Sequence, residues 1–130
     1  MRLILDTHIL LWWAAADRRL TKSIRDVITA EDNDIAVSAA TFWELAIKKS
    51  LGRIDVDLDE LHRAATADGF QEMPVIIDHA VRLQGLPELH RDPFDRMLIV
   101  QAIAEERRLL TRDEAILAYR GVSGFDPLEA

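Results

Sequence analysis

Short runs of apolar residues alternate along the chain with segments in which apolar residues recur every three or four positions. The apolar runs lie at residues 2–6, 35–38, 70–75, 108–111 and 122–125. The segments with the longer repeat lie at residues 8–16, 21–31, 39–51, 57–68, 78–84, 92–107 and 113–119. The first pattern predicts buried β-strands and the second predicts amphipathic helices. Strands and helices that alternate in this way predict the α/β class, with a mainly parallel central sheet covered on both faces.

Two of the predicted helices have clear boundaries. In the segment 39–51 apolar residues recur at helical spacing, and Gly52 supplies a stop. The longest segment opens with Asp92 and Pro93, which match an N-cap and a first helical residue. Asp95 would then be the third helical residue, where an acid favours the helix dipole. Capping alone therefore accounts for Asp92 and Asp95.

The composition is that of one compact domain spanning residues 1–130. Apolar residues make up 49% of the chain and charged residues 30%, and a domain of this length buries roughly two thirds of its unfolded surface. The chain has no cysteine, which excludes disulfides and thiolate metal ligands. No apolar run approaches the ~20 residues of a membrane span. Asp6 and His8 interrupt the start, which lacks the features of a signal peptide, so we expect a cytoplasmic protein.

Several acids lie where parallel sheets usually form their sites, just beyond the carboxyl ends of the strands. Asp6 ends the first predicted strand, and Asp113 follows the fourth by one residue. Asp95 lies in the first turn of the longest helix. Glu44 lies in the helix after the second strand, about 130° from the centre of its apolar stripe at about 100° per residue. All four acids can therefore face a cleft at this edge of the sheet.

Asp6, Asp113 and Glu44 can each also be explained by a purely structural role. Asp6 can satisfy backbone donors in a turn. Asp113 can be a simple helix N-cap. Glu44 stands four residues before Lys48, and a pair in this orientation stabilises an exposed helix.

These local explanations do not require the acids to meet, whereas a parallel sheet can bring them into one cleft. Carboxylates held within a few ångström of one another raise their pKa values unless a cation neutralises them. Oxygen ligands without cysteine or paired histidines favour Mg²⁺ or Mn²⁺ over zinc. Such ions lower the pKa of a bound water and support phosphodiester hydrolysis.

At these residues the sequence resembles the PIN-domain family of metal-dependent ribonucleases, in particular the VapC-type toxins of type II toxin-antitoxin systems. The match runs nearly end to end through LILDTHILLW, VSAATFWELAIKKSLGRI, HRDPFDRMLIVQA and LLTRDEAI. The resemblance carries the catalytic, metal-binding acids over to Asp6, Glu44, Asp95 and Asp113. It gives supporting positions to Thr7, Ser38, Asp92 and Thr111.

The resemblance implies a single-domain, three-layer α/β/α fold of Rossmann-like type that cleaves RNA with Mg²⁺ or Mn²⁺. It also implies a VapB-type antitoxin as partner, and a homodimer. The net charge of −7 argues against a broadly basic surface, so RNA binding needs basic side chains near the motifs. The candidates are Lys48, Lys49, Arg53, Arg91, Arg96 and Arg112. Taken singly, each is more simply interpreted as solvated charge.

Two other functions stay open at the level of sequence. A phosphatase would use a nucleophilic Asp6, but that chemistry usually needs a second Asp two residues on, where this chain has His8. A catalytically silent PIN-like interaction module would keep the fold without the site, and the presence of all four acids argues against it. Trp12 and Trp13 fit core or dimer packing better than stacking on RNA or an antitoxin. Isolated histidines predict surface or capping roles. These are His8, His62, His79 and His90.

Overall fold

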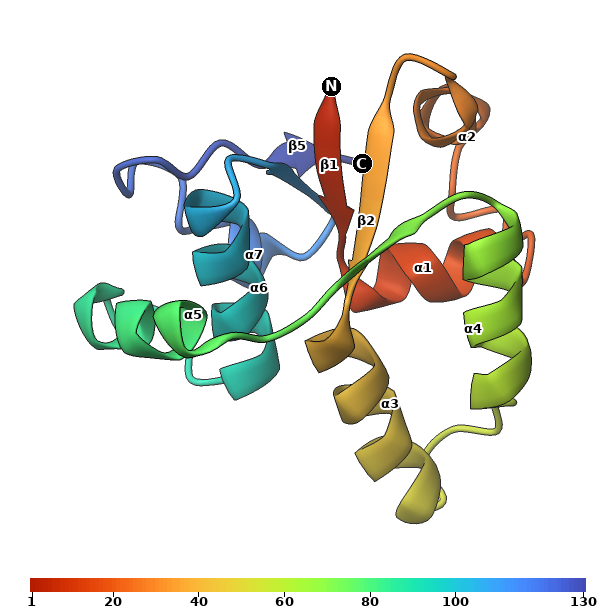
Figure 1. Cartoon of the computed structure of the whole chain (residues 1–130), viewed down its shortest axis with the longest axis horizontal. Helices are drawn as coiled ribbons and strands as arrows, with labels where there is room; N and C mark the ends of the chain where they lie inside the picture. The colour runs from red at the N-terminus through yellow and green to blue at the C-terminus, as the bar shows by residue number, and fades with distance from the viewer.

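Five parallel strands form one sheet in the order β3-β2-β1-β4-β5 (Figure 1). The strands are β1 (Arg2–Leu5), β2 (Asp34–Ser38), β3 (Gln71–Met73), β4 (Arg108–Thr111) and β5 (Leu128–Glu129). The computed structural model describes all residues, 1–130. Leu3 of β1 pairs with Ile35 of β2 on one side and with Arg108 of β4 on the other. The first strand is therefore the centre of the sheet.

Helices cover both faces of this sheet. They are α1 (Thr7–Ala14), α2 (Lys22–Thr29), α3 (Ala39–Ser50), α4 (Leu58–Ala67), α5 (Ile77–Arg82), the 3₁₀ helix η1 (Leu83–Gly85), α6 (Pro93–Ala104) and α7 (Glu114–Leu117). Leu3 and Leu5 pack with apolar residues of α1, α2 and α4, whereas Ile4 packs with those of α6 and α7. Because successive strand residues point to opposite faces, these are two cores in three layers, which confirms the predicted α/β/α fold. No helix is both long and apolar enough to span a membrane.

The last predicted strand is wrong. Residues 122–125 form a turn, in which the Phe125 N–H donates to the Val122 carbonyl at 3.0 Å. Gly121 and Gly124 have φ values of 95° and 84°, a left-handed conformation that suits glycine and interrupts a strand. The fifth strand is β5, a few residues later. The apolar residues of this stretch signal burial, since Phe125 belongs to the core, but they do not signal pairing.

The helix predicted over residues 92–107 is shorter in the structure. Helix α6 ends at Ala104 with Glu105 as its C-cap. Glu106 then takes a left-handed φ of 52° and turns the chain back toward β4. The apolar run identifies the helix, but the residue that ends it carries no glycine or proline signal.

Helix α3 presents its apolar stripe to solvent. Trp43, Ile47 and Leu51 are 62%, 39% and 60% exposed, although their spacing is that of a core-facing stripe. The buried residues of α3 are Ala40, Thr41, Glu44 and Leu45. Figure 1 shows the reason, because α3 continues from the end of β2 and extends beyond the sheet. Only its first two turns have a core to pack against.

Candidate metal centre at the strand ends

The sheet order places two of the predicted acids at adjacent strand ends. Chain connections leave β1 toward β2 on one side, and β4 toward β5 on the other. Between such diverging connections an α/β sheet leaves a crevice at the carboxyl ends of its strands. Asp6 follows β1 directly, and Asp113 follows β4 after one residue. The backbone N–H of Asp6 donates to the Leu110 carbonyl at 3.0 Å, which fixes the end of β1 beside β4.

Thr111 joins the first and last acids. Its hydroxyl donates to Oδ2 of Asp6 at 2.8 Å and accepts the backbone N–H of Asp113 at 3.0 Å. Asp6 stands at the N-cap position of α1 without forming a side-chain capping bond, and it is 2% exposed. Burial raises the pKa of the Asp6 carboxyl, and the hydrogen bond from Thr111 opposes that rise. The Asp6 carboxylate is thus buried without a basic side chain to pair with, which helix capping does not explain.

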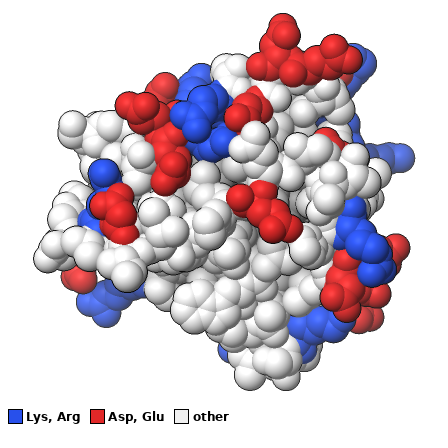
Figure 2. All heavy atoms as spheres, in the orientation of Figure 1, with Lys and Arg blue, Asp and Glu red and all other residues white.

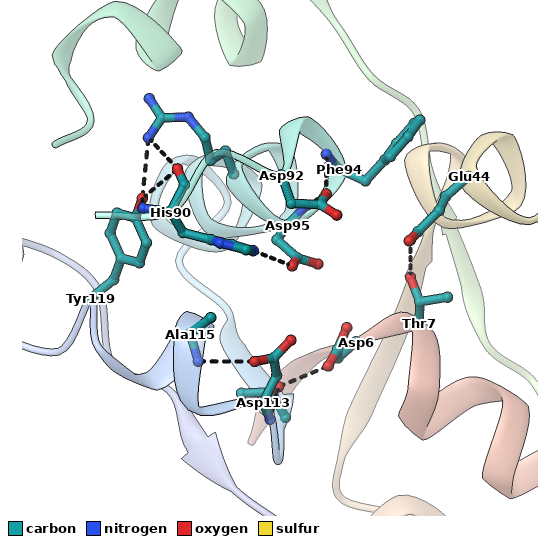
Figure 3. Close-up of polar contacts among 12 residues, drawn as sticks. Asp6, Thr7, Glu44, His90, Asp92, Phe94, Asp95, Asp113, Ala115 and Tyr119 are labelled. Carbon is teal, nitrogen blue, oxygen red and sulfur yellow. Dashed lines mark hydrogen bonds and ion pairs between the residues drawn. The ribbon is translucent and has the colours of Figure 1, made fainter. Parts of the chain in front are cut away.

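Asp113 is the N-cap that the sequence suggested. Its Oδ1 accepts the backbone N–H of Ala115 at 2.9 Å and so begins α7. Figure 3 shows the carboxylates of Asp6, Asp95 and Asp113 pointing toward a common space. Capping therefore uses one oxygen of Asp113 and leaves the group turned toward the other acids.

The first turn of α6 aims Asp95 at the same space. The carboxylate of Asp92 accepts the backbone N–H groups of Phe94 at 2.9 Å and Asp95 at 3.0 Å, which confirms Asp92 as the N-cap. Burial raises the pKa of Asp95 to about 7; a hydrogen bond with His90 opposes that rise, and the charges of Asp92, Asp6 and Asp113 add to it. The carboxylates at the strand ends are therefore electrostatically coupled.

His90 is a site residue that the sequence reasoning missed. Its Nε2 lies 2.9 Å from Oδ2 of Asp95, as Figure 3 shows. Ligand atoms of His90, Asp92 and Asp95 all lie within 4.8 Å of one another. An isolated histidine predicts a surface or capping role, but this one stands two residues before an Asp-Pro helix start. That position next to a candidate acid is the signal that would have found it.

The loop that carries His90 is held by Arg96 and Tyr119. The Tyr119 hydroxyl accepts the backbone N–H of His90 at 3.0 Å and Nη1 of Arg96 at 3.1 Å. The Arg96 guanidinium also donates to the carbonyls of Pro87 at 2.9 Å and Leu86 at 3.2 Å. Arg96 was a candidate for RNA contact. Its donors are instead directed at this loop, so its observed interactions position His90.

Glu44 approaches from the other side of Asp6. Its Oε1 accepts the Thr7 hydroxyl at 2.8 Å, and its Oε2 pairs with Nζ of Lys48 at 2.9 Å. The helix pair with Lys48 therefore exists, yet Glu44 is only 5% exposed, so it is not the exposed surface pair of the simpler interpretation. Among the lysines and arginines, Lys48 alone forms an ion pair with one of the four acids.

Ser38 supports the helix that carries Glu44. Its hydroxyl accepts the Ala40 N–H at 3.0 Å, which caps α3, and donates to Oε1 of Gln101 at 2.6 Å. Gln101 lies within the apolar run of α6 and is fully buried. Its amide contacts the Pro74 carbonyl at 3.2 Å and Nδ1 of His79 at 3.3 Å. A polar chain that the sequence did not suggest thus ties α3 to α6.

Comparison with known proteins identifies the family. The model of the PIN domain matches residues 3–122. The chain belongs to the PIN domain family. A curated relative, Ribonuclease VapC22 of Mycobacterium tuberculosis, is 29% identical over 119 residues, which cover 90% of this chain and 91% of the relative.

Solved structures share the fold of this PIN domain at low sequence identity. A crystal structure of VapBC2 from Rickettsia felis bound to a promoter DNA fragment aligns with a TM-score of 0.71 at 17% identity, covering 100% of this chain and 99% of that one. A toxin-antitoxin complex from Klebsiella pneumoniae aligns with a TM-score of 0.64 at 21% identity, covering 98% of this chain and 99% of that one.

The donor set of this PIN domain suits a hard divalent ion. Carboxylate oxygens from several elements face one space, and burial raises the pKa values of Asp6 and Asp95 there. Oxygen ligands of this kind match Mg²⁺ or Mn²⁺. A bound cation would favour the ionised carboxylates and so lower these pKa values again. The acids therefore fit a metal in the type of donor they offer. The ligand atoms that lie within 4.8 Å of one another are those of His90, Asp92 and Asp95, and Asp6 and Asp113 face the same space.

The other basic candidates occupy different environments. Lys49 donates to the Val56 carbonyl, away from the acids. Arg53 and Arg91 are exposed. Arg112 lies directly beside Asp113 and donates to the carbonyl of Arg19. Two of these four are adjacent in sequence to candidate metal ligands, Arg91 to His90 and Asp92, and Arg112 to Asp113.

Proposed function

We propose that this PIN domain is a metal-dependent endoribonuclease and the toxin of a VapBC-type toxin-antitoxin pair. The observation that carries the proposal is the set of coupled carboxylates of Asp6, Asp95 and Asp113 at the strand ends, with raised pKa values at two of them. The relatives add support, since one is called a ribonuclease and the solved structures are VapBC or toxin-antitoxin complexes. A catalytically silent module has no need for uncompensated buried charge.

In this proposal Asp6, Asp95 and Asp113 hold Mg²⁺ or Mn²⁺. When bound, the ion lowers the pKa of water and stabilises charge on the phosphate oxygens. Thr111 keeps one oxygen of Asp6 fixed, and His90 does the same for one oxygen of Asp95. Each carboxylate thus keeps its other oxygen for the ion, and its orientation is set before the ion arrives.

Glu44 has a separate role, as a further ligand or as the base that orients water. Both of its oxygens are engaged, one by Thr7 and one by Lys48. Each carboxylate oxygen has a second lone pair, so Glu44 can approach the ion while it still contacts Thr7 and Lys48. Lys48 is one of the basic residues near the motifs that are candidates for contact with an RNA phosphate.

The test is cleavage of total RNA by the purified wild type with Mg²⁺ or Mn²⁺, compared with Asp6→Ala. The wild type is expected to cleave and EDTA to stop it, whereas Asp6→Ala falls to the EDTA level and keeps its circular dichroism spectrum. Asp126→Ala is the matched control, because this acid is exposed and pairs with Arg108. Equal cleavage by wild type and Asp6→Ala would contradict the proposal. Sequencing of the RNA ends then identifies the substrate.

We also propose a VapB-type antitoxin as partner and the cytoplasm as the compartment. The support is that the solved neighbours are toxin-antitoxin complexes. Expression of the wild type alone is expected to arrest growth, and co-expression with the product of the adjacent reading frame is expected to restore it. Copurification of the two chains would establish the pair.

A homodimer is the remaining part of the proposal. The apolar stripe of α3 lies exposed at Trp43 and Ile47, and Ile77 and Val81 of α5 are 82% and 53% exposed. Figure 2 shows a broad area without charged residues at the lower centre of the molecule, where Figure 1 places the region between α3 and α5. Apolar areas of this kind are typical of association surfaces. Sedimentation is expected to show a dimer that Ile77→Asp dissociates, and a monomeric wild type would contradict it.

A further inference from the structure

Two arginines from distant parts of the chain meet over the ring of Trp12. The guanidinium carbon of Arg19 lies 4.9 Å from the centre of the Trp12 ring, and that of Arg112 lies 5.0 Å from it. Arg112 also donates to the backbone carbonyl of Arg19. A tryptophan ring attracts a guanidinium electrostatically at this distance. Trp12 therefore holds two cationic groups close together, although like charges repel.

This cluster adjoins the candidate metal ligands. Arg112 stands between Thr111, which bonds Asp6, and Asp113. The ring of His8, two residues after Asp6, lies 6.0 Å from the ring of Trp12. The cluster thus shares two chain segments with Asp6 and Asp113, one after β1 and one after β4.

The charges of the cluster are only partly neutralised within the protein. Arg19 forms a bidentate pair with Asp17, through Nε at 3.1 Å and Nη2 at 2.8 Å. Arg112 has no carboxylate partner. The stretch DRRLTKSIRD, residues 17–26, contains four basic residues and two acids, and Lys22 pairs with Asp26 at 2.9 Å. In a chain with net charge −7, this is a local excess of positive charge beside an acidic centre.

We propose that Trp12, Arg19 and Arg112 form a subsite that binds a backbone phosphate of single-stranded RNA next to the scissile bond. The inference rests on the proposed ribonuclease function, and it names how the substrate is held. A polyanion that enters the metal centre passes uncompensated carboxylates, so it needs cations at the entrance. Guanidinium groups suit this task because their planar donors match phosphate oxygens and their faces stack on bases. Trp12 contacts the faces of the two guanidinium groups and so positions them without accepting hydrogen bonds from their N–H groups.

The test measures affinity and its salt dependence. Binding of fluorescein-labelled oligouridylate to the full chain is followed by anisotropy in EDTA over a series of KCl concentrations. Removing one interaction with a phosphate lowers the slope of log affinity against log salt by about 0.7 for a single strand. Arg112→Ala is expected to lower the slope by about this amount and to weaken binding about tenfold at low salt. Arg19→Ala should have a smaller effect, because Asp17 shares its charge.

Two further variants separate position from charge. Arg112→Lys is expected to keep the salt slope, while Trp12→Leu keeps both arginines and weakens binding about threefold. The matched control is Arg18→Ala. Arg18 is exposed and next to Arg19 in the sequence, but its guanidinium is not one of the two that lie over the Trp12 ring. Arg18→Ala should leave the slope unchanged. A decrease equal to that of Arg112→Ala would mean diffuse charge and would overturn the subsite.

Cleavage assays with Mg²⁺ distinguish this proposal from the function it rests on. Arg112→Ala should raise KM with kcat within about twofold, since a phosphate held away from the reacting atoms contributes to binding of ground state and transition state alike. Cleavage by the wild type with unchanged binding in Arg112→Ala overturns the subsite alone. If RNA binding depends on Arg112 but the wild type does not cleave RNA, the proposed ribonuclease function is contradicted and the RNA subsite is supported. Loss of antitoxin binding in Arg112→Ala with RNA binding intact would make the cluster a protein-docking surface, contrary to the proposal.

Discussion

At the edge of the sheet where the strands begin, the guanidinium of Arg107 lies among β1, β2 and β3, whereas at the edge where they end three carboxylates face one another. Arg107 donates to the Leu3 carbonyl and to the carbonyl of Asp34, both at 3.1 Å. It also contacts the Asp34 carboxylate at 3.1 and 3.3 Å and Oε1 of Gln71 at 3.2 Å. The charge of this buried guanidinium is therefore neutralised by Asp34, and Nε is its one nitrogen without a hydrogen-bond partner.

The opposite edge leaves its charge uncompensated. Burial raises the pKa values of Asp6 and Asp95, and no basic side chain pairs with the former. Both edges contain buried ionisable groups, but at the strand ends Asp6 has no partner of opposite charge, although His90 pairs with Asp95 and Lys48 with Glu44. Buried charge that is matched serves the fold, while buried charge that is unmatched destabilises the folded protein and marks the place where a ligand is expected.

The largest effect is expected at the matched edge. Arg107→Ala should lower the free energy of unfolding by about 3 kcal/mol, because it leaves the Asp34 carboxylate and the Leu3 carbonyl without their partner. Urea denaturation followed by circular dichroism measures this loss. Metal affinity of the folded protein should not change, since Arg107 lies at the other end of the strands. A loss of less than about 0.5 kcal/mol would show that the ion pair does not stabilise the sheet.

An intermediate effect is expected at the unmatched edge, and it depends on pH. The pKa of Asp95 rises from 3.8 to about 7 on folding, so the folded protein favours the protonated form. Protonation of Asp95 therefore stabilises the folded protein relative to the unfolded chain. This contribution is fully present below pH 3.8 and is lost as the pH rises through about 7. In EDTA the unfolding free energy should therefore fall between these limits by on the order of 2 kcal/mol, about half of what the full shift corresponds to, because solvent partly screens the Asp95 carboxylate. Urea midpoints at several pH values measure it.

Asp95→Asn and added Mg²⁺ sharpen the same comparison. The variant removes the titrating group, so much of the decrease in stability with rising pH should disappear, while Asp6, whose pKa is also raised, keeps part of it. Mg²⁺ at about a hundred times its Kd should stabilise the wild type by about 2.7 kcal/mol above pH 7, where the carboxylates are ionised. A wild type that Mg²⁺ does not stabilise at any pH would contradict the metal centre.

The smallest effect is expected at Asp92, which caps α6 and is also a candidate metal ligand. Asp92→Ala removes two capping bonds of α6 and should cost about 1 kcal/mol, whereas Asp92→Asn keeps an acceptor and should cost less than about 0.5 kcal/mol. Thermal unfolding measures both. Calorimetric titration with Mn²⁺ then decides the role of the charge. Unchanged affinity in Asp92→Asn leaves Asp92 a cap, and a clear loss makes it a ligand.

Much of the site could be predicted because its acids lie next to signals that are local in sequence. Asp6 and Asp113 follow apolar strands, and Asp92 precedes a proline. These patterns reflect backbone hydrogen bonding and helix capping, which depend on neighbours within a few residues. The structure puts these side chains at the predicted edge of the sheet. Their roles in metal binding and catalysis stay predictions.

Contacts between distant residues could not be predicted in this way. Ser38 and Gln101 are 63 residues apart, and a glutamine within an apolar helix has no pattern that names its partner. Arg96 looks like a surface charge in the sequence, yet its guanidinium holds the loop of His90. A side chain with many donors is compatible with several roles, and only the positions of the surrounding carbonyls select one.

The sequence by itself determined the order of strands and helices, the α/β class and the acids at the strand ends, because periodicity and capping are local properties of the chain. The tertiary structure alone decided which apolar faces are covered. The spacing of Trp43, Ile47 and Leu51 records an apolar stripe, but α3 extends past the sheet and leaves that stripe exposed. Only the fold brought Arg19 and Arg112 together over Trp12, since burial and long-range proximity depend on how the elements pack, which a linear pattern does not contain.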